Sequence, residues 1–171
     1  MEIFDLYDRQ GKKLNRTMVR GHHNKPGEYH KVIHLWIRNA QGAYLIQQRN
    51  KASDHHPYQW APTAGAVIQG ETPIQCVLRE SKEEIGLTID PDKLIHIDTI
   101  YVENYKANFI IELFLIHMDV DMDQVCIDPT EVKKVALVDN EHIHNLLKNQ
   151  QFWNFDDIDP QYLQKLERSI K

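Results

Sequence analysis

Three glutamates, Glu80, Glu83 and Glu84, stand three and four residues apart in a short stretch of the chain. If this stretch is helical, their side chains are neighbours on one face, where like charges cost roughly a few tenths of a kcal/mol per pair. A divalent cation would reverse the sign of that interaction. Because gathered carboxylate oxygens suit hard cations, the spacing predicts a site for Mg²⁺ or Mn²⁺.

The residues around the glutamates predict a helix from Pro73 to Ile85. Thr72 can cap its start, Pro73 suits the first helical position, and Gln75 has the spacing of a capping box. Gly86 can take the left-handed conformation that ends many helices.

Two faces of this helix have different compositions. Arg79 flanks the acidic face, and Lys82 points away from it. The core-facing stripe is expected to consist of apolar side chains at helical spacing: Ile74, Val77, Leu78 and Ile85.

A charged, solvated face would be the ordinary interpretation of a glutamate-rich helix. Here the loop before the helix belongs to the same pattern, with fixed residues at fixed spacings: Gly65, Glu71, Arg79, Glu80, Glu83, Glu84 and Gly86, then the apolar Leu87. This pattern closely resembles the signature of the Nudix hydrolase family. The one departure is Ser81, where the family usually has an apolar residue, and it falls on the core-facing side.

The resemblance implies an α/β fold, a Nudix-like α/β/α sandwich with a mixed β-sheet and a loop-helix-loop metal site. It implies that Glu80, Glu83 and Glu84 are metal ligands or bases, with Glu80 and Glu84 as the principal ligands. The main-chain carbonyl beside Gly65 is a further expected ligand. Arg79 and Glu71 are expected to brace the glutamates. The implied reaction is metal-dependent hydrolysis of a diphosphate bond in a small molecule, often linked to a nucleoside.

Residues outside the signature suggest where substrate binds. Arg49, Lys51, Pro57 and Trp60 resemble a strand end and loop of the isopentenyl-diphosphate isomerase-like branch of the family. A guanidinium offers a planar fork of donors for phosphate oxygens, so Arg49 and Lys51 are candidate substrate-binding residues. A surface ion pair is the alternative for Arg49.

One carboxylate, Glu112, interrupts the apolar run FIIELFLI. Because a buried unpaired carboxylate is costly, Glu112 either faces solvent or points into the metal site. Nudix proteins often have a further glutamate ligand outside the signature, and Glu112 is the first candidate for it. Glu103 and Glu131 are the next candidates.

Length and composition fit one domain. The 171 residues are 42% hydrophobic and 26% charged, with a net charge of −5, which gives no electrostatic case for a nucleic-acid polymer or an anionic membrane. No secretory signal or membrane-length apolar run is visible, and Cys76 and Cys126 have no motif that requires pairing. The sequence therefore predicts a cytoplasmic protein. A homodimer is a common default that nothing in the sequence demands.

Periodicity predicts the order β-β-β-β-β-α-β-β-β-α-α in a single domain, 1–171. The first 28 residues form an N-terminal hairpin and loop, and residues 140–171 form a helical tail. Its aromatic residues Phe152, Trp153 and Phe155 are expected to anchor it to the core, with stacking on a nucleobase as the alternative. Strands are expected over 2–7, 12–20, 30–38, 43–49, 61–66, 94–102, 108–118 and 133–138, with a turn near 104–106, and the tail helices over 140–149 and from 159 onwards.

Two other functions remain open. Isopentenyl-diphosphate isomerases need a cysteine before the signature glycine and a metal-binding histidine after it, and this chain has Ala64 and Ala66 there. A Nudix fold kept only to bind a ligand would predict an eroded signature, whereas every charged signature position is present. The family resemblance favours a nucleoside di- or triphosphate as substrate, and no residue pattern specifies which.

Overall fold

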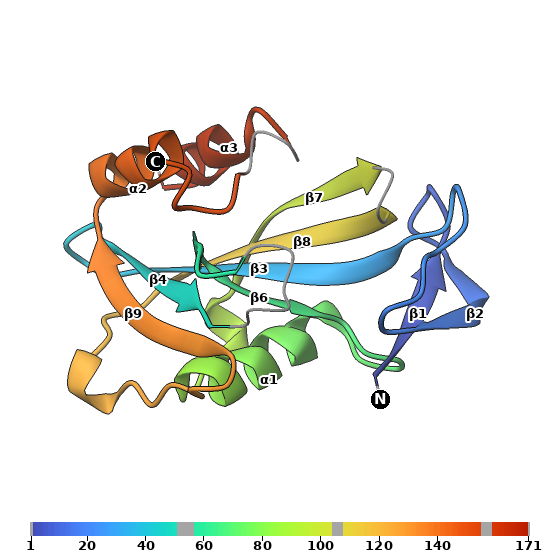
Figure 1. Cartoon of the computed structure of the whole chain (residues 1–171), viewed down its shortest axis with the longest axis horizontal. Coiled ribbons are helices and arrows are strands. Elements are labelled where there is room, and N and C mark those ends of the chain that lie inside the picture. The colour runs from blue at the N-terminus through green and yellow to red at the C-terminus, as the bar shows by residue number, and fades with distance from the viewer. Residues whose placement is uncertain (1, 51–56, 104–107, 155–158, 171) are drawn as a thin grey trace.

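A mixed β-sheet lies between two layers of helix in the computed structural model, which describes residues 2–50, 57–103, 108–154 and 159–170 (Figure 1). The strands are β1 (Ile3–Tyr7), β2 (Lys13–Val19), β3 (His30–Arg38), β4 (Tyr44–Arg49), β5 (Trp60–Ala61), β6 (Thr63–Ala66), β7 (Ile95–Glu103), β8 (Asn108–His117) and β9 (Val132–Val138). The α-helices are α1 (Pro73–Ile85), α2 (Asn140–Lys148) and α3 (Tyr162–Arg168). Two short 3-10 helices cover Pro91–Lys93 and Met122–Gln124.

Strand β3 is the centre of the seven-stranded sheet. It pairs in parallel with β8 along its whole length, and β8 pairs with β7. Its other edge is shared, because β4 pairs with it only at Ile37 and Arg38, and β6 pairs with it from Val32 to Leu35. Strand β4 then diverges from β3 and pairs with β5 and β9. The split brings the end of β4 and the whole of β6 to the part of the sheet that α1 covers.

The prediction of a single strand over residues 61–66 is wrong. Pro62 separates β5 from β6, and β5 pairs with β4 whereas β6 pairs with β3. Proline has no N–H to donate to a strand ladder, so it allows the chain to cross between two neighbours of the sheet at this point. Among the described residues, six strands therefore precede α1 rather than five.

The two faces of β3 pack into two separate cores. Ile33, Leu35 and Ile37 lie in the cluster with Val77 and Ile85 of α1. Trp36, in the alternating position, lies in the cluster that includes side chains of α2 and α3. Alternation along a strand sends successive side chains to opposite faces, which is why one apolar strand supplies both cores. The predicted α/β/α sandwich is confirmed.

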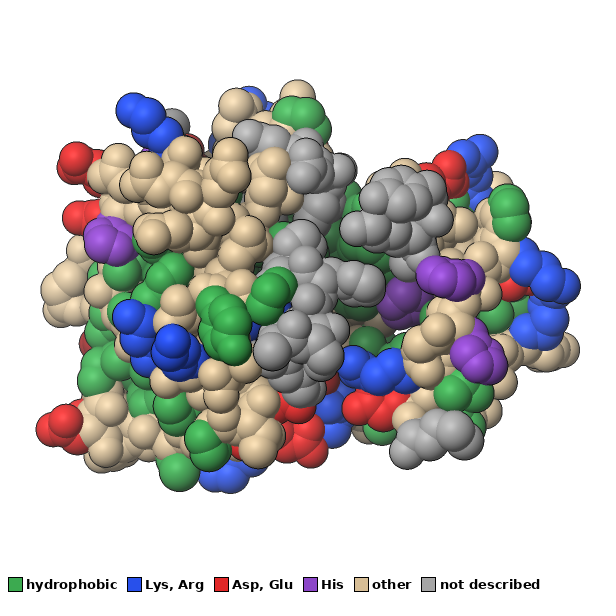
Figure 2. All heavy atoms as spheres, viewed as in Figure 1, with side chains coloured by type: hydrophobic (Ala, Val, Ile, Leu, Met, Phe, Trp, Pro, Cys, Tyr) green, Lys and Arg blue, Asp and Glu red, His purple; other side chains and the backbone are tan. Residues whose placement is uncertain are grey.

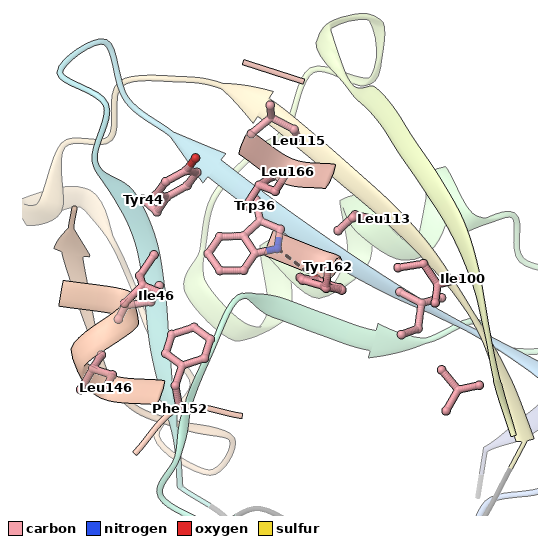
Figure 3. Close-up of a cluster of buried hydrophobic side chains, with 13 residues drawn as sticks. Trp36, Tyr44, Ile46, Ile100, Leu113, Leu115, Leu146, Phe152, Tyr162 and Leu166 are labelled. Atoms are coloured by element: carbon pink, nitrogen blue, oxygen red, sulfur yellow. Dashed lines mark hydrogen bonds between the residues drawn. The ribbon is translucent and has the colours of Figure 1, made fainter. Parts of the chain in front are cut away.

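The C-terminal helices cover the face opposite α1. Trp36 Nε1 donates a hydrogen bond of 3.0 Å to the hydroxyl of Tyr162 in α3, at the centre of this cluster (Figure 3). Phe152 is buried beside them and Trp153 packs on the same cluster, as the predicted anchoring role requires. Phe155, Lys51 and the predicted turn near 104–106 lie outside the described residues. Within the described ranges, no helix combines the length and apolarity needed to cross a membrane.

The predicted N-terminal hairpin, β1–β2, lies at one end of the sheet, beside the connection from β6 to α1 (Figure 1). Tyr7 and Tyr29 exchange backbone hydrogen bonds of 2.7 and 2.9 Å, which join β1 to the residue before β3. Phe4, Leu6 and Met18 form a small core of their own, against which Ile68 of that connection packs. The hairpin is therefore packed against the residues that lead into α1.

Candidate active site

Helix α1 has the boundaries that the sequence predicts, Pro73–Ile85. The Thr72 hydroxyl accepts from the Gln75 N–H at 3.2 Å, and the Gln75 side chain accepts from the Thr72 N–H at 2.8 Å, completing the capping box. Gly86 ends the helix with φ of 73°, in the left-handed region. Local signals alone therefore fix the element that carries the glutamates.

The buried stripe of α1 differs from the prediction at one residue. Val77 and Ile85 are fully buried, and Leu78 packs at the edge of the same core. Ile74 is 42% exposed, so its predicted place in the core is wrong: it lies in the first turn, and the apolar cover does not extend that far along the helix. Ser81 is fully buried, as expected for its core-facing position.

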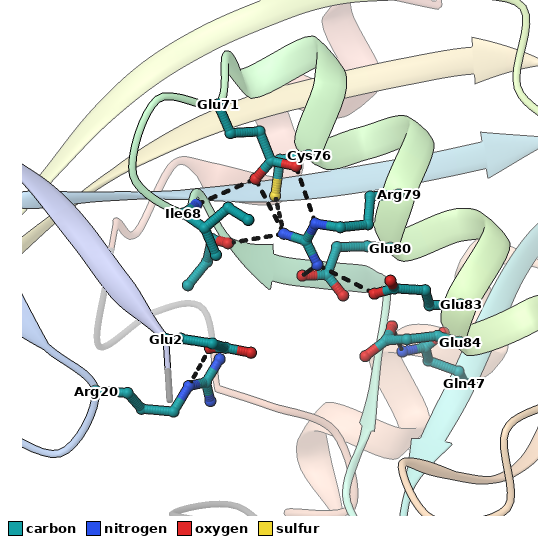
Figure 4. Close-up of polar contacts among 11 residues, drawn as sticks. Glu2, Arg20, Gln47, Ile68, Glu71, Cys76, Arg79, Glu80, Glu83 and Glu84 are labelled. Atoms are coloured by element: carbon teal, nitrogen blue, oxygen red, sulfur yellow. Dashed lines mark hydrogen bonds and ion pairs between the residues drawn. The ribbon is translucent and has the colours of Figure 1, made fainter.

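Arg79 is the centre of the polar network on the acidic face (Figure 4). Its Nε and Nη2 donate to the two carboxylate oxygens of Glu71 at 2.9 and 3.0 Å. Its Nη1 donates to Glu80 at 2.7 Å and to Glu83 at 3.2 Å. Its Nη2 also donates to the Ala66 carbonyl at 3.1 Å. One guanidinium thus ties the loop before the helix to two of the signature glutamates, the bracing role expected for Arg79 and Glu71.

Gly65 and Glu80 are in close contact. A Cβ built on Gly65 would stand 2.1 Å from Glu80 Oε1, so any side chain there would displace the carboxylate. Gly65 pairs with Ile33 in the sheet, directly under α1. The signature requires glycine at this position because the Glu80 carboxylate lies against the backbone of β6.

Glu84 is the most buried of the three clustered glutamates, with 9% of its surface exposed. Its carboxylate accepts a 2.6 Å hydrogen bond from the Gln47 amide, and Gln47 in turn accepts from the Thr63 hydroxyl at 3.2 Å. Burial raises the pKa of Glu84 to about 8, and the nearby Glu80 charge adds to the increase. Burial also raises the pKa of Glu80, although Arg79 opposes the effect. Both carboxylates would be stabilised in their charged form by a cation.

The residues at this site fit a divalent metal ion. The expected ligands are all oxygens, which Mg²⁺ and Mn²⁺ prefer, and the bare backbone at Gly65 leaves room for Glu80 beside the main chain. In the described part of the chain, no three His, Cys, Asp or Glu side chains are already arranged as a ligand set. Glu80 and Glu83 bind Arg79, and Glu84 binds Gln47, so these carboxylates would exchange hydrogen-bond partners for a metal.

Arg49 is at the end of β4, near the same carboxylates. Burial lowers the pKa of its guanidinium, and the negative charges of Glu84 and Glu131 oppose that decrease. The interaction with Glu84 brings Arg49 to the candidate site, where a phosphate could compete for it.

The three glutamates considered outside the signature have different surroundings. Glu112 lies on β8, and its oxygens accept from Lys31 Nζ at 2.5 Å and from the Thr99 hydroxyl at 2.8 Å. Burial would raise the pKa of Glu112, but these hydrogen bonds hold it below its usual value. Glu103 pairs with Arg9 of the hairpin at 2.8 Å. Glu131 acts on Glu84 electrostatically. A metal-binding role for Glu112 stays a prediction, and Lys31 explains how this apolar strand accommodates the carboxylate.

Sequence reasoning missed Gln47 and the hairpin residues Glu2 and Arg20. Glu2 and Arg20 form an ion pair across from the signature glutamates (Figure 4). Figure 2 shows acidic and basic side chains gathered where the surface is hollowed between the hairpin end and the rest of the molecule. A polar residue in the apolar strand YLIQQR was a local signal for Gln47. The hairpin contacts join residues far apart in sequence and had no such signal.

The described fold is a mixed sheet between helices, and an arginine-braced glutamate cluster lies on the loop and helix that follow β6. The family description "NUDIX domain" matches residues 28–157, and the chain therefore belongs to the Nudix family. The family match and the named relatives of this chain identify the protein as a hydrolase. Its class cleaves diphosphate bonds in small molecules.

Two kinds of protein, named as Nudix hydrolases and as isomerases, are similar to this chain in sequence. An uncharacterized Nudix hydrolase of Listeria innocua is 33% identical over 153 residues, which cover 89% of this chain and 88% of that protein. An isopentenyl-diphosphate Delta-isomerase of Streptomyces griseus is 29% identical over 140 residues, 80% of this chain and 70% of the isomerase. The resemblance to the isomerase-like branch is therefore found over most of the chain.

Solved structures share the fold. DR0079 from Deinococcus radiodurans matches with a TM-score of 0.71 at 18% identity, covering 91% of this chain and 95% of that one. The NUDIX domain of Shewanella oneidensis NrtR, solved with ADP ribose, matches with a TM-score of 0.66 at 14% identity, covering 84% and 89%. At these identities, the two matches establish the architecture alone.

Proposed function

We propose that this protein hydrolyses a diphosphate bond in a nucleoside diphosphate-linked small molecule, with Mg²⁺ or Mn²⁺ as cofactor. Glu80, Glu83 and Glu84 would hold the metal, together with the main-chain carbonyl beside Gly65. Arg49, and Lys51 beyond the described end of β4, would bind phosphate oxygens.

The observation that carries the proposal is the state of Glu84. This carboxylate is buried and receives a neutral amide hydrogen bond from Gln47, and its pKa is raised to about 8. Such a group lowers the stability of the fold when it is charged. A cation at the site would reverse that cost, which supports a role in binding rather than in folding.

A bound divalent ion would supply charge neutralisation at the phosphates and a more acidic water. The residues of this chain would do the rest. Arg79 holds Glu80 and Glu83 in place through its bidentate bond to Glu71. Glu84 is a candidate general base, because its carboxylate lies at the acidic face near Glu80. Arg49 would orient the diphosphate. Which glutamate removes the proton from water stays open.

The isomerase relative favours a second candidate, an isopentenyl-diphosphate isomerase-like activity. Ala64 and Ala66 occupy the places where that chemistry needs a cysteine and a histidine. Both alanines lie on β6, beside Gly65, so neither side chain can donate a proton or bind a metal at the site. We therefore place hydrolysis first. The NUDIX domain solved with ADP ribose motivates a third candidate, a domain that only binds its ligand.

A substrate panel would decide among these candidates. Phosphate or pyrophosphate release would be measured with Mg²⁺ and then Mn²⁺, from nucleoside di- and triphosphates, nucleotide sugars, dinucleotide cofactors, dinucleoside polyphosphates and isopentenyl diphosphate. Glu84→Gln would serve as the matched variant, since it keeps the shape and removes the charge.

Metal-dependent release that is lost in Glu84→Gln would support the hydrolase and identify its substrate class. Isomerised isopentenyl diphosphate would instead favour the second candidate. If no compound reacts but one of them raises the melting temperature, the hydrolase proposal fails and the ligand-binding domain takes its place.

A further inference from the structure

We propose that Asp5, in β1 of the N-terminal hairpin, is a positioning residue for the active site. It would hold the loop before α1, and through that loop the Arg79 network. The inference deepens the proposed function and rests on it. The family match begins at residue 28, so Asp5 lies outside the matched domain.

Asp5 is a buried carboxylate that joins the hairpin to the signature loop. Only 5% of its surface is exposed. Its Oδ2 accepts from the Gly70 N–H at 2.8 Å and from Lys13 Nζ at 2.6 Å. One residue away, the Gln69 N–H donates to the Ile3 carbonyl at 2.7 Å. Two consecutive N–H groups of the loop are thus held by β1.

The Gly70 contact depends on the conformation of the loop. Gly70 has φ of 81°, in the left-handed region that favours glycine, and the turn directs its N–H to the Asp5 carboxylate. A bond between a backbone N–H and a carboxylate is stronger than one between neutral groups. Lys13 compensates the charge of Asp5 from the exposed side of the hairpin, with 54% of its own side chain exposed.

The next contacts lead from the loop into the site. The Ile68 N–H donates to Glu71 Oε2 at 3.1 Å. Glu71 receives the two bonds from Arg79, and Arg79 binds Glu80 at 2.7 Å. Each step is a single residue or a hydrogen bond, so a displacement of Gly70 would be transmitted to the carboxylates. Glu71 follows Gly70 directly in the chain, so only one residue separates the Asp5 contact from the partner of Arg79.

A purely structural role is the competing explanation, and Arg9 provides the control for it. Arg9 also ties the hairpin to the sheet, through bonds of 2.8 and 3.1 Å to Glu103. That contact does not involve the signature loop. Arg9→Ala therefore weakens hairpin docking and leaves the Asp5–Gly70 bond in place.

The experiment compares Asp5→Ala, Asp5→Asn and Arg9→Ala in the full chain. It measures kcat and KM with the substrate found by the panel, hydrogen exchange of the amides of residues 67–71, and the melting temperature. Loss of an outer partner of a metal site typically costs about 10–100-fold, and Asp5 acts one step further out, so Asp5→Ala should lower kcat about fivefold. KM should change little, and the amides of residues 67–71 should exchange faster. Asp5→Asn keeps only a weaker, neutral acceptor for Gly70 and should recover part of the rate, with kcat still below that of the wild type. Arg9→Ala should match the wild type in kcat and in the exchange of this loop.

Equal kcat in Asp5→Ala and Arg9→Ala would overturn the proposal, as would unchanged exchange in residues 67–71. If Asp5→Ala does not fold, Asp5→Asn is compared with Arg9→Ala at equal melting temperature, and faster exchange confined to the loop with a lower kcat is required. If the wild type hydrolyses no diphosphate, the proposed function fails, and the exchange data still decide whether Asp5 holds the loop.

Discussion

Two buried glutamates show how differently the same side chain can be accommodated. Glu112 and Glu84 are exposed by only 7% and 9%. Glu112 contacts the ammonium of Lys31 at 2.5 Å, whereas Glu84 receives an amide hydrogen bond from Gln47 at 2.6 Å. The pKa of Glu112 is lowered despite its burial, and burial raises the pKa of Glu84 to about 8. Burial acts to raise both pKa values; Lys31 and the other hydrogen-bond donors overcome it at Glu112, whereas the partners of Glu84 do not.

The two carboxylates differ in the charge that the fold places beside them. The ion pair with Lys31 stabilises the charge of Glu112 within the fold. Burial and, to a smaller extent, the charge of Glu80 disfavour the charged form of Glu84, and the nearby Arg49 offsets these effects only in part. The comparison therefore makes two predictions directly testable: metal binding by the signature glutamates and the role of Glu112 as a ligand.

The largest expected effect is on catalysis. Glu84→Gln should lower kcat about 100-fold to 1000-fold, in the range for losing a general base or a charged group of the site. The two roles considered for Glu112 predict different results for Glu112→Gln. If Lys31 neutralises the carboxylate and no metal binds it, kcat and the Mn²⁺ dissociation constant should stay within about threefold of the wild type, whereas loss of a metal ligand should weaken Mn²⁺ binding. Steady-state kinetics and calorimetric Mn²⁺ titration measure both. A tenfold loss of Mn²⁺ affinity in Glu112→Gln would make it a ligand and break the comparison.

Removing the positive charge of Lys31 beside Glu112 should lower the stability of the fold. Lys31→Met leaves the Glu112 charge buried without its ammonium, and should lower the free energy of unfolding by about 3 kcal/mol at pH 7. Because the pKa of Glu112 is lowered in the fold, this stabilisation is present above the unfolded pKa and is lost as pH falls through the folded pKa. Urea unfolding at pH 7 and pH 3 measures the change.

The matched control for Lys31→Met is Lys93→Met, at an exposed pair with Asp90 of 3.4 Å. It should change the free energy of unfolding by less than about 0.5 kcal/mol. Equal effects of the two variants would mean that the Lys31–Glu112 pair is no more than a surface ion pair.

Glu84 should give the opposite pH dependence in metal-free protein. Its pKa is raised from the ordinary value of 4.5 to about 8, so between these values the folded state binds more protons than the unfolded state. The contribution of Glu84 to stability is then fully present below the unfolded pKa and decreases as pH rises toward 8. In EDTA, the advantage of Glu84→Gln over the wild type should grow between pH 5 and pH 8, by on the order of 2 kcal/mol. Mg²⁺ should reduce it, and a pH-independent difference would contradict the assignment.

A smaller effect on the free energy of unfolding is expected at Ser81, a polar but uncharged residue of α1. Ser81 is fully buried, and its hydroxyl has no hydrogen-bond partner among the described residues. Ser81→Ala should raise the free energy of unfolding by about 1 kcal/mol at every pH, since it removes an unsatisfied polar group without a charge. Thermal unfolding at pH 5 and pH 8 would measure it, and a destabilised variant would mean that the hydroxyl is bonded.

The helix and the signature network were predictable because their determinants are local. The cap at Thr72, the stop at Gly86 and the spacing of the glutamates all lie within a few turns of one helix. The structure confirms both ends of this helix, and the glutamates lie on it as predicted. Most strands could be recognised from their apolar periodicity. The break at Pro62 was missed because the apolar pattern continues across it, although a proline inside a strand was a warning.

The partners of the buried charges could not be predicted in the same way. Lys31 reaches Glu112 because β3 and β8 run in parallel with a particular register, a pairing across about 80 residues that no local pattern specifies. Asp5 meets Gly70 for a similar reason, since hairpin docking is a tertiary contact. The hydrogen bond between Gln47 and Glu84 is also a tertiary contact that no local pattern specifies.

The most direct test of the central claim is a ¹³C NMR titration of the Glu84 carboxyl group, with Glu112 as the internal reference. Without metal, Glu84 should titrate well above the usual carboxyl range and Glu112 below it. Mg²⁺ should lower the pKa of Glu84 by more than one unit and leave that of Glu112 unchanged, because Glu112 already contacts the Lys31 ammonium at 2.5 Å, whereas burial still raises the pKa of Glu84 despite the charge of Arg49. A normal pKa for Glu84 that Mg²⁺ does not move would contradict the account.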